Sequence, residues 1–387
     1  MEKSINPFKL LLVALLIVFI YAGLLLSKKN TYEWVFVYYM SYDNDLSGFG
    51  ETILRDLKKG ITSPEIAVVT QADFADGKGM RRIALYRALG RIKRKEISLQ
   101  NEDSADPAEL EKYFKWIQEK WKAENYCVIF LNHGGTLNNM CRDEKPFQDQ
   151  NENKLFTSGK WLPATEVGKI VADFNRKVDG KVRLLFLQQC GRAAIQSLYN
   201  LIDTAEYIMA SSVKVGAPNT YYTKLLKSVA DEPDTTGTAI ANIIMQEDEH
   251  YTIYTLIGNN ELKNLPEKLS AVLESFLQNA TLKPPQSCTA IFEFEGEKFF
   301  DLKSYLQALS SANNETAAKE LRIFFDWCDN HLIVSQSLNN AGGPAETSHC
   351  GLSIYVPSNQ KDVGRYNFLP LYQQTDIDKF FLLATQE

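Results

Sequence analysis

Residues 125–135 read NYCVIFLNHGG and residues 181–192 read KVRLLFLQQCGR, and these two stretches decide the fold. Each contains an apolar run with the length and composition of a buried strand. The first run ends at His133 and the second at Cys190, and glycine follows each of them. In an open α/β sheet the functional loops gather beyond the carboxyl ends of the strands. We therefore expect a histidine and a cysteine at one edge of a sheet.

Strand patterns alternate with helical patterns from Thr31 to about residue 232. We expect strands at 33–40, 65–72, 81–88, 125–132, 181–188 and 205–211, and helices at 46–58, 107–121, 163–177 and 193–201. Pro107 after Asp106 marks a helix start, since proline is favoured in the first turn. The alternation predicts an α/β fold with a largely parallel central β-sheet and helices on both faces.

The pattern changes after the segment DEPDTTG at residues 231–237. Helical periodicity dominates beyond it, and we expect helices at 236–247, 262–279, 300–311 and 315–328, with strands at 288–294 and 350–357. We interpret this part as a mostly helical C-terminal extension that packs on the core. The predicted division is an N-terminal segment at 1–30, a core at 31–232 and the extension at 233–387.

The N-terminal segment contains an uncharged, mostly apolar run from Leu10 to Leu26, with lysines on both sides. The run is near the lower length limit for a membrane-spanning helix and is longer than most signal-peptide cores. No convincing cleavage site follows it, so we favour an uncleaved membrane anchor over a cleaved signal. Either alternative predicts that the rest of the chain is exported to the periplasmic or extracellular side.

Composition excludes several classes of function. The formal net charge of −6 argues against a nucleic-acid binder, and we interpret the basic stretch at 81–95 as the solvated face of a strand pair. The six cysteines are sparse, and Cys127, Cys288 and Cys328 lie in apolar runs, so we expect buried free thiols rather than a disulfide set. No C-x-x-C or H-E-x-x-H motif occurs, so we expect no metal site.

The two strand ends supply the groups that nucleophilic catalysis needs. Cys190 would precede a helix, whose N-terminal amides favour the thiolate, and Arg192 would add a positive charge if it points toward the sulfur. His133 would supply the proton for a leaving amine. The amides of Gly134 and Cys190 would hold the developing oxyanion. This combination predicts a cysteine peptidase.

Further motifs resemble those of the clostripain-type (C11) cysteine peptidases, relatives of caspases, legumain and gingipains. They are VFVYYMSYDNDL at 35–46, FLNHGG at 130–135, the strand that ends at Cys190, GLSIYVP at 351–357, RYNFLPLY at 365–372 and IDKFF at 377–381. The resemblance covers nearly all of residues 33–387. It implies a caspase-like fold, His133 and Cys190 as a catalytic dyad, and a peptide or protein substrate.

The resemblance also implies two properties that only some relatives have. Some mature by cutting their own loop after the histidine strand, which here is the polar segment 141–160. Certain relatives respond to calcium, so Ca²⁺ is a candidate by resemblance alone, and no cofactor is required by the predicted chemistry.

The chain departs from the family pattern at the pocket for the P1 residue. Members that cut after arginine or lysine typically carry aspartate two residues before the nucleophile, where this chain has Gln188. The segment ASSVKVGAPNTYY at 210–222, with Ser211 and Lys214 as candidate substrate-binding residues, lacks the acidic residue normally found there. Because an unpaired buried cation is costly, we expect neutral or acidic P1 residues. The same change makes self-cleavage at Lys145, Lys154 or Lys160 doubtful.

Two alternatives remain open at this stage. The first is a catalytically inactive, membrane-anchored binding or scaffold protein of the same fold. The second is a nucleotide-binding α/β enzyme, since Gly48 and Gly50 follow a strand. Its fingerprint is defective, because Ile53 replaces the third glycine and the turn is too long.

Overall fold

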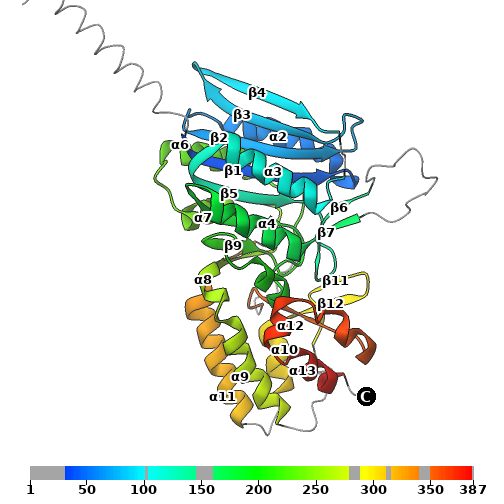
Figure 1. Ribbon diagram of the computed structural model, residues 1–387. Helices are drawn as coiled ribbons and strands as arrows, with labels where there is room; N and C mark the ends of the chain where they lie inside the picture. The colour runs from blue at the N-terminus through cyan, green and yellow to red at the C-terminus, as the bar shows by residue number, and fades with distance from the viewer. Residues whose placement is uncertain are drawn as a thin grey trace, which may run out of the picture.

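The computed structural model places most of the chain in one α/β structure (Figure 1). The described residues are 31–100, 103–144, 160–278, 288–310, 315–339 and 349–385. The predicted anchor at 1–30 lies outside them, as does most of the predicted loop at 141–160. Of the helices in the described ranges, none is long and apolar enough to cross a bilayer.

A nine-stranded sheet forms the centre, in the order β13-β10-β9-β8-β5-β1-β2-β3-β4. Its strands in chain order are β1 (Thr31–Tyr42), β2 (Ile66–Phe74), β3 (Arg81–Ala88), β4 (Arg91–Ser98), β5 (Lys122–Leu131), β8 (Lys181–Gln188), β9 (Tyr207–Ala210), β10 (Ile253–Gly258) and β13 (Ile333–Leu338). The five strands from β9 to β2 are mutually parallel, and the strands outside them pair antiparallel. The predicted fold class is therefore confirmed.

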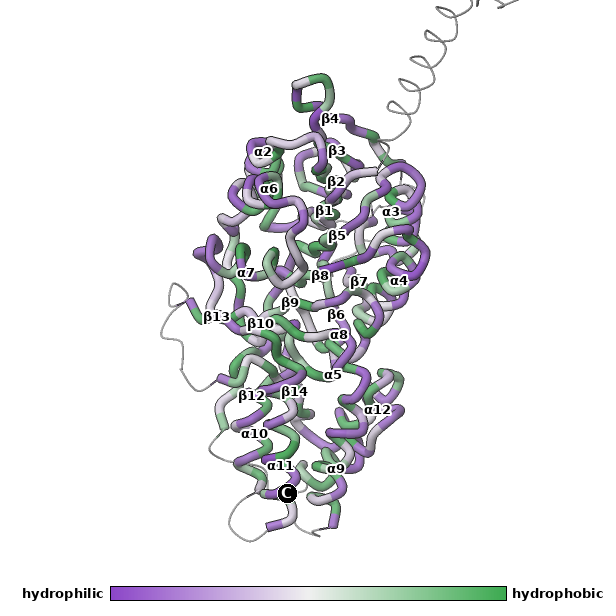
Figure 2. Tube along the Cα trace, turned by 90° about the vertical axis from the view of Figure 1, so that its left-hand side faces the viewer, coloured by the Kyte–Doolittle hydropathy of each residue, from purple (hydrophilic) through white to green (hydrophobic). Residues whose placement is uncertain are grey.

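Strand β1 shows why this sheet is buried on both sides. Val35 and Val37 lie in one hydrophobic core, while Phe36 and Tyr38 lie in the other. Successive side chains of a strand point to opposite faces, so a continuous apolar run suits a strand that is covered twice. Figure 2 shows hydrophobic residues along the central strands of the sheet.

Helices cover both faces. Helices α3 (Pro107–Lys120) and α4 (Ala164–Lys177) contribute to the first core, and α2 (Gly50–Gly60), α6 (Tyr222–Asp231) and α7 (Gly237–Glu247) contribute to the second. The start of α3 is as predicted: Pro107 lies in the first turn and the carboxylate of Asp106 accepts a hydrogen bond from the amide of Ala108 (2.9 Å). The capped start fixes where the helix enters the sheet face.

The C-terminal part is mostly helical and lies below the sheet in Figure 1. Its elements are α8 (Asn259–Leu262), α9 (Leu265–Leu277), β11 (Phe292–Phe294), β12 (Glu297–Asp301), α10 (Leu302–Leu309), α11 (Glu315–Trp327), a π-helical turn (Cys328–Leu332), β14 (Ser353–Val356), a 3₁₀ segment (Gln360–Tyr366), α12 (Pro370–Gln374) and α13 (Ile377–Ala384). Strands β11, β12 and β14 form a small antiparallel sheet.

Several elements differ from the sequence expectations. Strands β10 and β13 were not predicted, and they join the central sheet from beyond residue 232. The strand expected at 288–294 forms only as β11. The helix expected at 193–201 is instead the four-residue α5 (Ile195–Leu198) followed by a 3₁₀ turn (Tyr199–Leu201). The division of the chain at residue 232 stays a prediction.

Candidate active site

The histidine lies just beyond β5. The ring nitrogen Nε2 of His133 is 2.6 Å from Oδ1 of Asp45. Asp45 opens a 3₁₀ turn (Asp45–Phe49) directly after β1, and the side chain of Asn44 caps that turn. The Asp45 carboxylate thus holds the Nε2 side of the His133 ring, a contact that the DNDL motif did not disclose.

The cysteine lies just beyond β8. The Cys190 sulfur accepts a hydrogen bond from the amide of Val215 (3.3 Å), and its thiol is 3.7 Å from the carbonyl oxygen of the same residue. Gly191 follows with a φ of +65°, a conformation that favours glycine. The loop around Val215 thus lies directly against the thiol.

The histidine and cysteine loops touch at Gly134. A Cβ atom at this position would lie 1.9 Å from the carbonyl oxygen of Cys190, so only glycine permits the contact. No carbonyl group in the described part of the chain accepts a hydrogen bond from the amides of Gly134 or Cys190. The structure therefore brings the loops that carry His133 and Cys190 into backbone contact at the carboxyl ends of β5 and β8, and the roles of these residues and of the Gly134 and Cys190 amides stay predictions.

Arg192 is placed differently from the sequence expectation. Its side chain is fully buried and points to backbone carbonyls instead of the thiol. The guanidinium donates to the carbonyl oxygens of Cys190 (3.2 Å), Gly135 (2.7 Å), Thr136 (3.1 Å) and Asn139 (2.9 Å). The five fixed donors of arginine suit this cluster of acceptors. Arg192 therefore joins the histidine loop to the cysteine loop.

The helix that was expected to stabilise the Cys190 thiolate does not begin directly after Cys190. Helix α5 begins at Ile195, and its four residues are separated from the thiol by a turn. Burial instead raises the pKa of the Cys190 thiol, although the Val215 amide and the charges of Arg192 and Lys214 act in the opposite direction. A buried thiol resists ionisation because its anion loses hydration.

The raised pKa of the Cys190 thiol predicts how the free enzyme reacts with an alkylating agent. Thiolate is the reactive form, so the iodoacetamide reaction rate at Cys190 should still be rising above about pH 8.5, the ordinary thiol value. The rate can be followed by mass spectrometry of the modified peptide across a pH series. A rate that levels off below pH 7 would show that the thiol pKa is lowered instead of raised.

Comparisons with known proteins agree with this geometry. The family model described as the clostripain family, Peptidase C11, matches residues 38–381. The chain belongs to the clostripain family. As a member it is a cysteine peptidase, and the resemblance drawn from its motifs is confirmed.

Solved structures of C11 proteases share the fold of this clostripain-family chain. An inactive zymogen from Parabacteroides distasonis aligns with a TM-score of 0.67 at 15% identity, covering 89% of this chain and 98% of that one. A secreted C11 cysteine protease from Bacteroides thetaiotaomicron aligns with a TM-score of 0.67 at 15% identity, covering 89% and 99%. A secreted C11 cysteine protease from Bacteroides thetaiotaomicron in complex with an irreversible peptide inhibitor gives 0.65 at 16% identity, with the same coverage. A search of curated proteins gave no match.

Gln188, two residues before the cysteine, is buried and fully engaged by neighbours. Its amide nitrogen donates to the side-chain oxygen of Asn219 and to the hydroxyl of Tyr222 (3.0 Å), and its carbonyl oxygen accepts from the hydroxyl of Tyr221 (2.6 Å). The amide of Asn219 in turn donates to the carboxylate of Asp248 (2.6 Å). Burial raises the pKa of Asp248, against the hydrogen bonds that it accepts. Sequence reasoning missed Asn219 and Asp248, which are distant from Gln188 along the chain.

The other two candidate substrate-binding residues differ from one another. Ser211 is fully buried, and its hydroxyl exchanges hydrogen bonds with the backbone of Val213 (3.2 Å). Its carbonyl oxygen also accepts from the amide of Ala193 (2.9 Å), so it supports the cysteine loop. Lys214 is exposed and lies close enough to Cys190 to favour the thiolate. Of the pair, only Lys214 reaches solvent.

The ends of the expected loop at 141–160 form a strand pair. Strands β6 (Asn139–Asp143) and β7 (Lys160–Pro163) are antiparallel, and Cys141 is buried within β6. Lys160 forms an ion pair with Asp103 (2.6 Å). The other candidate self-cleavage residues, Lys145 and Lys154, lie outside the described residues.

The thiols and acidic groups show no metal centre in the described ranges. No group of three or more histidine, cysteine or acidic side chains there could hold a metal ion. The six cysteines are free thiols in the structure. Cys127 and Cys328 are buried, but Cys288 is only partly buried, because the segment before β11 does not form the expected strand.

Proposed function

We propose that this clostripain-family peptidase is an endopeptidase in which Cys190 is the nucleophile and His133 the proton carrier. The observation that carries the assignment is the contact between Gly134 and the Cys190 backbone, which places the ends of β5 and β8 together. The resemblance of both motifs to the family's histidine and cysteine motifs supports the same pair.

The reaction follows from these groups. His133 takes the proton of the Cys190 thiol, the resulting thiolate attacks the scissile carbonyl carbon, a C–S bond forms, and the carbonyl electron pair moves to oxygen, where the amides of Gly134 and Cys190 donate to it. Collapse breaks the C–N bond while His133 gives a proton to the leaving amine. Water then adds to the acyl group, His133 takes its proton, and the C–S bond breaks to release the carboxylic acid and the thiolate.

The network around Gln188 supports a non-basic P1 preference. Amides and tyrosine hydroxyls surround Gln188, where the resemblance places the floor of the P1 pocket, and the carboxylate of Asp248 is held behind Asn219. A guanidinium or ammonium group would find no carboxylate partner at Gln188, and burying an unpaired charge is costly. Both amide hydrogens of Gln188 are engaged, so they are not available to a substrate carboxylate either. Neutral P1 residues therefore fit this floor better than acidic ones.

A P1-diverse peptide library tests this preference. We expect neutral P1 residues to give the highest kcat/KM and arginine and lysine to be at least about tenfold poorer, since one lost charge pair corresponds to more than 1.4 kcal/mol. The library should be run on the wild type and on Cys190→Ala, so that a contaminating protease is recognised. A clear arginine or lysine preference that depends on Cys190 would refute the assignment.

We further propose that the chain is exported and held at a membrane by the apolar run at 10–26. The proposal rests on the sequence of that run and its flanking lysines. The proposed chemistry uses this chain's own groups and needs no cofactor. An activity assay with and without a chelator tests calcium dependence.

A further inference from the structure

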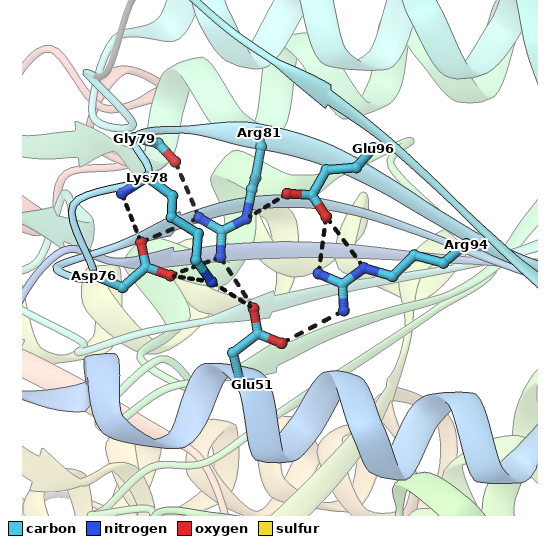
Figure 3. Close-up of polar contacts among 7 residues, drawn as sticks. All are labelled: Glu51, Asp76, Lys78, Gly79, Arg81, Arg94 and Glu96. Carbon is cyan, nitrogen blue, oxygen red and sulfur yellow. Dashed lines mark hydrogen bonds and ion pairs between the residues drawn. The ribbon is translucent and has the colours of Figure 1, made fainter.

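The β3–β4 hairpin carries the basic stretch of the sequence, and its two faces differ in how their charges are matched. On the face toward α2, Arg81 pairs with Asp76 (2.9 Å) and Glu51 (3.2 Å), and Arg94 pairs with Glu96 (2.9 Å), as Figure 3 shows. These arginines are therefore neutralised by neighbouring carboxylates. The prediction of a solvated face is therefore only partly correct for this side, because carboxylates pair with its arginines.

The opposite face presents cations without carboxylates. Cross-strand partners point to the same face of a sheet, and Arg82 pairs with Ile97 while Tyr86 pairs with Lys93. Because alternate residues of a strand also share a face, Arg82, Lys93 and Lys95 lie on the same side. None of the three cations forms an ion pair within the described part of the chain. Arg82 lies over the Trp116 ring and donates to the side-chain oxygen of Gln71 (3.0 Å), and Lys95 lies over the Tyr86 ring, so no carboxylate neutralises either charge.

A groove of about 730 Å³ lies on this face, between the hairpin and the end of α3. Four of its lining residues are aromatic and form a chain of ring contacts: Tyr32, Tyr86, Trp116 and Trp121. Five are basic and one is acidic, namely Arg82, Arg87, Lys95, Lys120 and Lys122 against Glu119. The indole nitrogen of Trp121 is buried and has no hydrogen-bond partner among the described residues. Lys122 pairs with Asp179 (3.3 Å), and the groove combines the remaining positive charge with aromatic surface.

The groove opens at the end of the molecule where the described chain begins. Thr31 is one of its lining residues, and the apolar run ends at Leu26, so at most about 18 Å of extended chain separates the two. The turn between β3 and β4 lies at the same end of the sheet (Figure 1) and exposes 96% of Leu89 to solvent. Basic, aromatic and apolar side chains therefore collect beside the point where the predicted anchor joins the core.

We propose that this face, defined by Arg82, Tyr86, Leu89, Lys93, Lys95 and Trp116, seats the peptidase on a bilayer that contains anionic lipids. Lysine and arginine near a membrane surface are attracted to anionic headgroups, and tryptophan and tyrosine favour the headgroup region. A nucleic acid would use the cations but not the exposed leucine at the tip. The proposal uses the predicted anchor for orientation and does not depend on peptidase activity.

The arrangement has a consequence for the active site. Strand β1 runs for 12 residues from Thr31 to Tyr42, about 40 Å at roughly 3.3 Å per residue. Asp45, the partner of His133, follows the far end of this strand. With the groove on the bilayer, the active site faces away from it and toward soluble peptides and proteins.

A vesicle flotation assay on the full chain tests the proposal. The double substitution Leu15→Arg/Leu16→Arg interrupts the apolar run, so that remaining binding reports the groove face. In this background we expect flotation with vesicles of phosphatidylcholine and phosphatidylglycerol, little with phosphatidylcholine alone, and loss of binding at high salt. Adding Lys93→Glu/Lys95→Glu should weaken binding at least about tenfold, and Leu89→Ser should also weaken it.

The matched control is Lys58→Glu/Lys59→Glu, which makes the same charge change on exposed positions of α2. It should leave flotation intact, and all variants should keep the wild-type Tm and peptidase activity. The proposal is overturned if the anchor-broken chain does not float with anionic vesicles, or if both charge reversals weaken binding equally. Binding of a single-stranded oligonucleotide in place of vesicles would also overturn it. Loss of peptidase activity in every variant would count against the proposed function and not against this surface.

Discussion

Cys190→Ala should lower kcat/KM for every cleaved peptide by at least about 10⁴-fold, because it removes the atom that forms the acyl bond. His133→Ala should cause a loss of similar size, since nucleophile and proton carrier act as one unit and their effects do not add. The measurement is steady-state cleavage of the preferred library peptide. Both variants should unfold at the wild-type temperature, because Cys190 is only partly buried and His133 lies at the surface.

A labelling experiment separates this result from general damage. An electrophilic peptide inhibitor should modify the wild type once and leave Cys190→Ala unmodified. The control is Cys288→Ser, because Cys288 is a partly exposed thiol outside the active-site loops. It should keep full labelling and activity. If purified wild type is neither labelled nor active on the library, the inactive scaffold alternative takes the place of the endopeptidase proposal.

The sequence was most informative where a local pattern determines the structure. The apolar runs ending at His133 and Cys190 form buried parallel strands, because only a doubly covered strand tolerates such a run. The Asp106–Pro107 start of α3 was also predictable, since capping is a contact between near neighbours. These features place the two candidate catalytic residues at one edge of the sheet.

Long-range contacts were less accessible. Strand β13 alternates between partly buried and exposed positions, and it becomes part of the sheet only by pairing with β10, about 80 residues earlier. Gln188 was recognisable as unusual from its position before the cysteine. Its role depends on Asn219, which it contacts, and on Asp248 behind Asn219. Both are distant from Gln188 along the chain, so no local sequence pattern predicts these contacts. Arg192 shows the same limit, because its guanidinium contacts backbone carbonyl oxygens of both loops and not the Cys190 sulfur.

Arg192→Leu should lower the free energy of unfolding by about 3–5 kcal/mol. This is the largest loss of stability that we predict for a substitution near the site. The substitution leaves carbonyl oxygens of both loops without donors, and each buried, unsatisfied group carries a penalty. Burial lowers the pKa of the Arg192 guanidinium to about 10, so it remains charged at neutral pH. Chemical denaturation of wild type and variant measures the difference.

Arg192→Lys distinguishes a positioning role from a purely structural one. Lysine keeps the charge but not the planar fork that reaches carbonyls of two loops at once, so stability should recover more than activity. We expect kcat/KM at least about 100-fold below the wild type, because a shift of the histidine loop relative to Cys190 disrupts the reacting geometry. The iodoacetamide rate at Cys190, which needs no histidine loop, should change far less. If kcat/KM and the alkylation rate fall together in proportion to stability, Arg192 serves the fold alone.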